Sequence, residues 1–121
     1  AADSARRDLE ARLRQWPDDP RLHLSLGWAH AYLGHKEEAI RTAERAVALM
    51  PISQDAVLGP AFVINLAIIY AWFGEVDAAV EQFDRYLSVP AGGSIEWILS
   101  DPRVDPVRDH PRFQALLERY E

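Results

Sequence analysis

Residues 26–40 read LGWAHAYLGHKEEAI, and residues 66–80 read LAIIYAWFGEVDAAV. Around Gly34 and around Gly74, apolar residues recur at spacings of three and four, which is the pattern of amphipathic helices. A glycine between two such helices is typical of a left-handed helix cap, because only glycine adopts that conformation without strain. The two stretches share four anchors in one register, 40 positions apart: Leu26 and Leu66, His30 and Tyr70, Gly34 and Gly74, Ala39 and Ala79. The chain therefore encodes one helical hairpin twice.

The same spacing continues along the chain and predicts helices over 5–16, 21–33, 36–49, 61–73, 75–88 and 112–120, with glycine or proline in the breaks. Pro17 precedes Pro51 by 34 positions, so 34 residues is the natural unit and six residues are inserted before the second hairpin. We expect a single all-α domain, residues 1–121. Its parts are a half repeat at 5–19, a first repeat at 20–53, an insertion at 54–59, a second repeat at 60–93 and a C-terminal capping segment at 94–121.

Composition narrows the function classes. Thirteen basic residues against nineteen acidic ones give a net charge of −6, so nucleic acid is not expected as a partner. The chain has no cysteine, which excludes disulfides and thiolate metal sites but leaves the compartment open, with the cytoplasm favoured over the periplasm. The uncharged run from Ala56 to Gly74 is broken by Gly59 and Pro60. That leaves roughly 20 Å of helix, short of a ~30 Å hydrocarbon core, so no membrane insertion is expected.

Two small residues occupy equivalent positions in the two hairpins, Gly27 and Ala67. Because they have almost no side chain, the partner helix, which carries Ala39 and Ala43 in the first hairpin, can approach closely. The sequence therefore predicts a close helix crossing in each hairpin.

These features resemble the tetratricopeptide repeat, whose pattern is W-x-x-L-G-x-x-Y, then A-x-x-x-F, then P. The first unit reads His23-x-x-Leu26-Gly27-x-x-His30, Ala39-x-x-x-Ala43, Pro51. The second reads Val63-x-x-Leu66-Ala67-x-x-Tyr70, Ala79-x-x-x-Phe83, Pro90. The resemblance covers about residues 5–91 and implies an α-solenoid that acts as a non-catalytic interaction or scaffolding module.

The segments PISQDAVLGP, LSVP and DPRVDPVRDHPRFQALL resemble the C-terminal repeat region of bacterial multidomain signalling proteins with kinase, nucleotide-cyclase or winged-helix domains. That resemblance implies a regulatory role, with the effector domain outside this chain.

The resemblance to tetratricopeptide repeats also implies that one arc of each first helix lines a concave face. We call these positions the concave arc, and predict a partner-binding surface from them: Arg21, Leu24, Ser25, Trp28, Tyr32, Ile64, Asn65, Ile68 and Trp72. Trp28, Tyr32 and Trp72 would be aromatic anchors for a peptide or protein segment, and Arg21, Ser25 and Asn65 would supply hydrogen bonds. The alternative is that neighbouring helices, such as 112–120, simply cover the arc. Leu24, Trp28, Ile64 and Ile68 stand where carboxylate-clamp members of the family place lysine and asparagine, so an acidic C-terminal peptide is not the expected ligand.

Other candidate sites are weaker. His23 and His30 could approach a metal, but both occupy packing positions of the repeat, so we expect no metal and no cofactor. The acidic residues from Glu75 to Asp84 fit a solvated helix face, and no catalytic motif is present, so we do not expect an enzyme. The Asp-Pro-rich strap could dock a partner through Arg103, Arg108 and Arg112 or close the end of the array, and we favour the cap.

The expected partner is a protein or peptide. Two alternatives of other classes stay open: the arc could mediate self-association, giving a homodimer, or hold a small molecule as a sensor.

Overall fold

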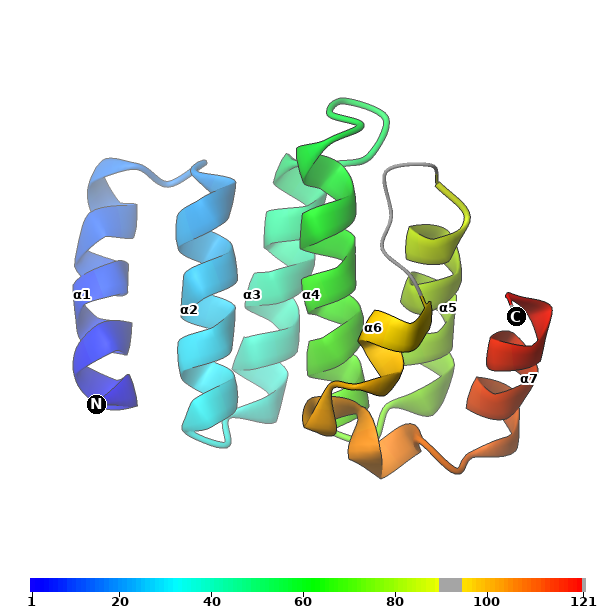
Figure 1. The fold of residues 1–121 in the computed structure, drawn as a ribbon. Helices are drawn as coiled ribbons and strands as arrows, with labels where there is room; N and C mark the ends of the chain where they lie inside the picture. Colours follow the sequence, from blue (N-terminus) through cyan, green and yellow to red (C-terminus); the bar gives the residue numbers. More distant parts are fainter. Residues whose placement is uncertain (90–94, 121) are drawn as a thin grey trace.

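A computed structural model describes residues 1–89 and 95–120, and over that part of the chain it is all-helical, as predicted. In Figure 1 the first five helices stand side by side in chain order, with α7 at the far end of the row. The elements are α1 (Ala2–Gln15), α2 (Pro20–Tyr32), α3 (Lys36–Leu49), α4 (Leu58–Trp72), α5 (Val76–Leu87), α6 (Ile95–Leu99), the 3₁₀ helix η1 (Pro102–Val107) and α7 (Pro111–Arg119). Each helix from α1 to α4 contacts the next one in the chain, which is the arrangement of a helical-repeat solenoid.

The turns inside the two hairpins are built alike, around the glycines of the opening sequence. Gly34 has φ 77° and Gly74 has φ 75°, which confirms the predicted left-handed caps. In the first turn the His35 N–H donates to the His30 carbonyl at 2.9 Å, and in the second the Glu75 N–H donates to the Tyr70 carbonyl at 2.9 Å. These bonds satisfy carbonyls at the end of each first helix, so one glycine and one register produce the same hairpin twice.

The close crossing predicted at Gly27 is present. A Cβ added there would lie 3.3 Å from the Ala39 carbonyl oxygen and 3.3 Å from the Ala43 nitrogen, so α3 approaches α2 to the limit of contact. Ala39, Ala43 and, in the second hairpin, Ala67 have no exposed surface. Small side chains at these positions are therefore a steric condition for the packing.

Helix α4 begins earlier than predicted, at Leu58, so Gly59 and Pro60 lie inside its first turn. The prediction that they break the helix was wrong, because proline lacks only an N–H that has no partner in a first turn. The Asp55 carboxylate accepts from the backbone N–H groups of Leu58, at 2.8 Å, and Val57. These two hydrogen bonds lower the pKa of Asp55. Gly59 is needed for a different reason: a Cβ there would lie 2.6 Å from the Cα of Ile52.

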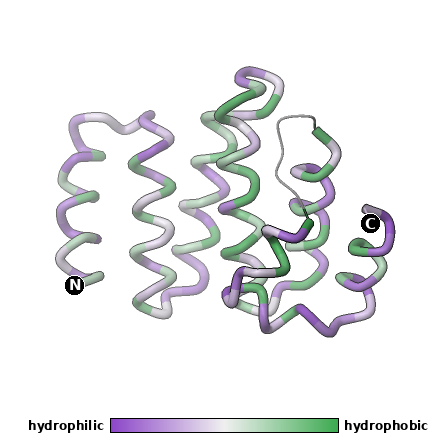
Figure 2. Tube along the Cα trace, in the orientation of Figure 1, coloured by the Kyte–Doolittle hydropathy of each residue, from purple (hydrophilic) through white to green (hydrophobic). Residues whose placement is uncertain are grey.

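Helix α4 is the centre of the core, and in Figure 2 it is the most continuously hydrophobic of the long helices. Most of its residues are buried, since α3, α5 and η1 all pack against it. Among the described residues, no helix combines the length and hydrophobicity that crossing a bilayer requires.

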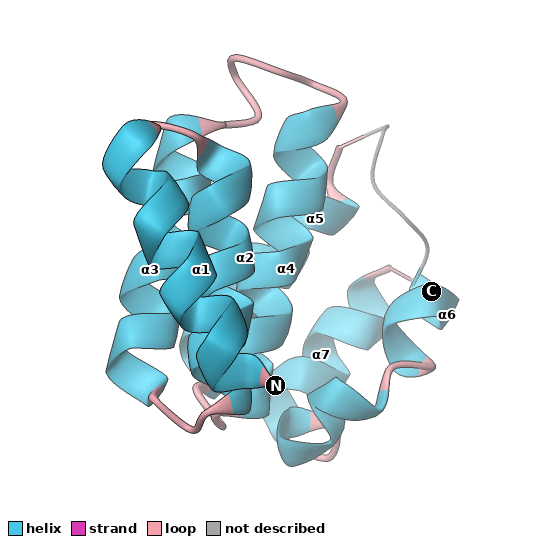
Figure 3. Ribbon diagram, turned by 90° about the vertical axis from the view of Figure 1, so that its left-hand side faces the viewer, coloured by secondary structure: helices cyan, strands magenta, loops and turns pink. Residues whose placement is uncertain are grey.

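The C-terminal segment forms two short helices that were not predicted, α6 and η1, before the predicted last helix α7. Figure 3, seen from the α1 end, places α6 and α3 on opposite sides of the view. Val104 and Val107 of η1 are buried, and η1 packs against α4. Phe113 of α7 contacts Phe83 of α5 with ring centroids 5.6 Å apart. The anchor Pro90 and the predicted boundary at 93/94 lie outside the described residues.

Candidate functional site

Three aromatic residues of the concave arc come together between α2 and α4. The Trp28 and Trp72 ring centroids are 5.9 Å apart, those of Trp28 and Tyr32 are 6.0 Å apart, and Tyr32 meets Trp72 edge-on at 5.2 Å. We call Trp28, Tyr32 and Trp72 the aromatic cluster. Its members come from both hairpins, Trp28 and Tyr32 from α2 and Trp72 from α4.

The aromatic cluster is open on one side. Tyr32 is 62% exposed, whereas Trp28 and Trp72 are half-buried against the core. A large side chain exposed this far, yet held by two aromatic neighbours, offers contact area with restricted motion. The opening therefore lies at Tyr32.

Asn65 positions the cluster. The Trp28 indole Nε1 donates to the Asn65 side-chain oxygen at 2.9 Å, and the Asn65 amide nitrogen donates to the Ala61 carbonyl one turn earlier at 2.7 Å. The indole N–H is thus satisfied where it is partly buried, and its orientation is fixed. Asn65, predicted to bind a partner, is engaged within the chain and orients Trp28.

The remaining positions on α2 form a stripe beside the cluster. Asp19 caps the start of this helix by accepting from the Arg21 N–H at 3.0 Å, and Pro20 occupies the first turn. Arg21 and Ser25 are exposed, and Leu24 is half-buried against the core. The α2 part of the concave arc is consequently open.

The α4 part of the arc is closed. Ile64 is 5% exposed and Ile68 is 2% exposed, so neither side chain is available on the surface of this structure. Both belong to the core cluster that also contains Val104 and Val107 of η1. η1 packs directly against α4, and the same cluster also contains residues of α7, the helix that the sequence suggested as cover.

Arg103 of η1 joins the aromatic cluster, and sequence reasoning missed this contact. Its guanidinium carbon lies 4.7 Å from the centroid of the Trp28 ring, in cation–π geometry. The Asp101 carboxylate accepts from Arg103 Nε at 3.0 Å and from Nη2 at 2.7 Å. This hydrogen-bonded pair lowers the pKa of Asp101 and raises that of Arg103. The pair Asp101–Arg103 is visible in the sequence, but its position over Trp28 depends on the folded chain.

The histidines have structural partners. His23 Nε2 lies 2.7 Å from the Pro17 carbonyl, and His30 Nδ1 lies 3.2 Å from His35 Nδ1. Burial, and next the nearby His35, lower the pKa of His30. Over residues 1–89 and 95–120, no three histidine or carboxylate side chains gather as metal ligands would.

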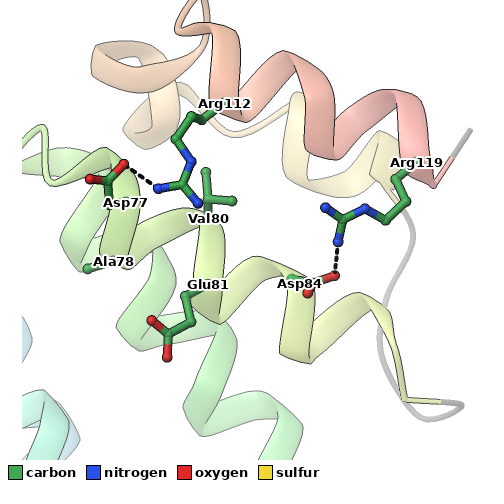
Figure 4. Close-up of a pocket in the computed structure, with 7 residues that line it drawn as sticks. All are labelled: Asp77, Ala78, Val80, Glu81, Asp84, Arg112 and Arg119. Carbon is green, nitrogen blue, oxygen red and sulfur yellow. Dashed lines mark hydrogen bonds and ion pairs between the residues drawn. The ribbon is translucent and has the colours of Figure 1, made fainter.

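A cavity of about 430 Å³ lies between α5 and α7, and Figure 4 shows its charged lining. The Arg112 guanidinium pairs with Asp77 at 2.6 Å, and Arg119 pairs with Asp84 at 3.0 Å. These ion pairs fasten α7 to α5. The cavity is lined by Asp77, Ala78, Val80, Glu81, Asp84, Arg112 and Arg119, none of which belongs to the concave arc.

The arginines considered for docking are used within the chain. Arg103 pairs with Asp101, and Arg112 pairs with Asp77. Arg108 donates to the Leu99 carbonyl at 2.6 Å and to the Asp101 carbonyl at 3.0 Å. Their contacts favour the interpretation of the strap as a cap that closes the array.

Comparison with known proteins agrees with the geometry of the first hairpin. A family model described as tetratricopeptide repeat matches residues 20–52, which span α2, α3 and the turn that follows. Searches of curated proteins and of solved structures found no match. The matched repeat, together with the stacked hairpins, supports a tetratricopeptide repeat domain.

Proposed function

We propose that this chain is a non-catalytic module that binds a protein or peptide segment on the open part of the concave arc, formed by the exposed stripe of α2 and the aromatic cluster. Tetratricopeptide repeats generally mediate protein–protein interactions, and one such repeat matches here. The observation that carries the proposal is Tyr32, which is 62% exposed while its ring is held edge-on against Trp72 at 5.2 Å.

Physical reasons favour Tyr32 as the anchor. Tyrosine brings a large amphipathic surface with only two side-chain torsions, so ordering it on binding costs little entropy. Here Trp28 and Trp72 already restrict the ring, which reduces that cost further. Arg21 and Ser25, exposed on the same helix, supply donors at the rim of the surface.

A second part of the proposal concerns the larger protein in which these repeats work. The tail that resembles the repeat region of bacterial signalling proteins supports a regulatory role within a larger protein. Sequencing the complete open reading frame tests this part. A kinase, cyclase or winged-helix domain joined to these repeats is the expected result, and an unrelated neighbour would contradict it.

The binding surface is tested by site-specific photo-crosslinking in cells. A photoreactive amino acid replaces Tyr32 in one variant and Glu118, exposed on α7, in the other. We expect a protein adduct at position 32 that is absent at position 118. Equal adducts at both positions would contradict the proposed surface.

The crosslinked protein is then purified and its affinity measured by titration calorimetry. Tyr32→Ala should weaken binding about 30-fold, since truncating an anchor costs about 2 kcal/mol. Trp16→Ala is the matched control, because Trp16 is an aromatic residue with 64% exposure outside the arc. Equal losses in the two variants would overturn the role of Tyr32.

Sedimentation tests the alternative that this surface mediates self-association of the chain. Sedimentation velocity of the wild-type chain should show a monomer over the concentration range used for calorimetry. A dimer that disappears in Trp72→Ala would replace the external partner by a second copy of this chain.

A further inference from the structure

A segment of the same chain packs against α4, the helix that carries the buried residues of the concave arc, Ile64 and Ile68. Val104 is fully buried and Val107 is 1% exposed, in the core cluster that includes Ile64 and Ile68. The segment follows α4 by some thirty residues in the sequence and returns to pack against it; in Figure 1 it is the orange stretch at the lower end of α4.

The segment from Asp101 to Val107 has the features of a bound peptide. It is a 3₁₀ helix, in which side chains three residues apart lie on one face, so Val104 and Val107 form a two-point apolar anchor. Asp101 caps the helix by accepting from the Arg103 N–H at 2.9 Å. The Val104 N–H also donates to the Asp101 carbonyl at 3.2 Å, so the first turn of the helix is held by bonds within the segment.

A third anchor lies at the edge of the segment. The Arg103 guanidinium covers the Trp28 ring at 4.7 Å, which connects the segment to the α2 side of the aromatic cluster. The Asp101 carboxylate holds the guanidinium plane through two hydrogen bonds, so its orientation is preset. Through Arg103 over Trp28 and the packing of η1 against α4, the segment contacts the first helix of each hairpin.

We propose that Asp101–Val107 is an internal ligand of the concave arc, and that it competes with an external segment for the α4 half. The inference rests on the proposed function, because it assumes that the arc binds partners. The external segment that fits the α4 half of the arc has the same chemistry as Asp101–Val107. It is a protein segment with an arginine followed by two branched apolar residues three positions apart, presented as one helical turn.

The probe is a fluorescein-labelled peptide with the sequence of residues 99–109, LSDPRVDPVRD. The receptor is the full chain with Val104→Asp and Val107→Asp, which places two carboxylates where the internal segment is buried and expels it. Fluorescence anisotropy should show that the peptide binds this receptor at least tenfold more tightly than it binds the wild-type chain. A peptide with the same two aspartates should not bind.

A matched receptor controls for added charge. Ser53→Asp with Ala115→Asp introduces two carboxylates at exposed positions, and it should bind the peptide as weakly as wild type. Peptide binding of equal strength to all receptors would overturn the inference, because the site would lie elsewhere.

Folding of the double-aspartate receptor is measured by far-UV circular dichroism. Retained helicity with no peptide binding would overturn the proposal that Asp101–Val107 is an internal ligand. It would not affect the binding surface at Tyr32, which the crosslinking tests. Loss of helicity overturns it as well, since a displaceable ligand cannot be indispensable to the fold. Failure of the proposed function is recognised separately, by equal effects of Tyr32→Ala and Trp16→Ala on the partner.

Discussion

Replacing Gly27 by valine tests the close crossing of α2 and α3. The Cβ alone would lie 3.3 Å from two backbone atoms of α3 and 3.4 Å from the Ala43 Cβ, so valine's two further carbons fit only if α3 moves. Overpacking of this kind costs typically 1–3 kcal/mol, and replacing a helical glycine offsets only a few tenths. We expect a net loss of about 2 kcal/mol in unfolding free energy, or roughly 6–10 °C in Tm for a chain of this size.

Urea unfolding followed by far-UV circular dichroism measures the effect. Ser25→Val is the control, since it places the same residue on an exposed position of the same helix and should change stability by less than about 0.5 kcal/mol. Gly27→Ala should be nearly neutral, because Ala67 occupies the equivalent position of the second hairpin. If Gly27→Val proved as stable as Ser25→Val, the steric argument would be refuted.

Three further outcomes are expected. Gly34→Ala or Gly74→Ala should cost about 1–2 kcal/mol from backbone strain alone, since nothing lies within 4 Å of the added carbon, and urea midpoints check this. Burial, together with a hydrogen bond to Glu44, raises the pKa of the Tyr70 hydroxyl in the folded chain. Tyr70 therefore ionises at a lower pH in the unfolded chain, so stability should fall above about pH 10, and less so in Tyr70→Phe. Burial lowers the pKa of the His30 imidazole in the folded chain, so on acidification His30 is protonated at a higher pH in the unfolded chain. Stability should therefore fall below about pH 6.5, and its dependence on pH should be weaker in His30→Gln.

The hairpins could be predicted because their determinants are local. Gly34 and Gly74 specify the turns by their backbone conformation, and Gly27 specifies the close helix crossing by its small size. Each of these features can therefore be predicted from a short stretch of sequence. The first turn of α4 was missed for a local reason also. Pro60 was treated as a break, although proline is tolerated in the first turn of a helix, and the Asp55 carboxylate accepts from the Val57 and Leu58 N–H groups at the start of this one.

The candidate site was predictable only in part. The repeat register indicated that Trp28, Tyr32 and Trp72 share a face, and the rings do meet. That face is shared with η1, because Arg103 lies over Trp28 and η1 packs against α4 from far along the chain. Periodicity describes one helix at a time, so it carries no information on which distant segment covers an apolar arc.

The central claim is that two equivalent hairpins bring the aromatic residues of α2 and α4 into one cluster. Nuclear Overhauser spectroscopy of the full chain, with the aromatic side chains assigned, tests it most directly. We expect cross-peaks between the rings of Trp28 and Trp72 and between those of Tyr32 and Trp72, whose centroids are 5.9 and 5.2 Å apart. Assigned spectra in which Trp72 shows no cross-peak to either residue of α2 would contradict the account.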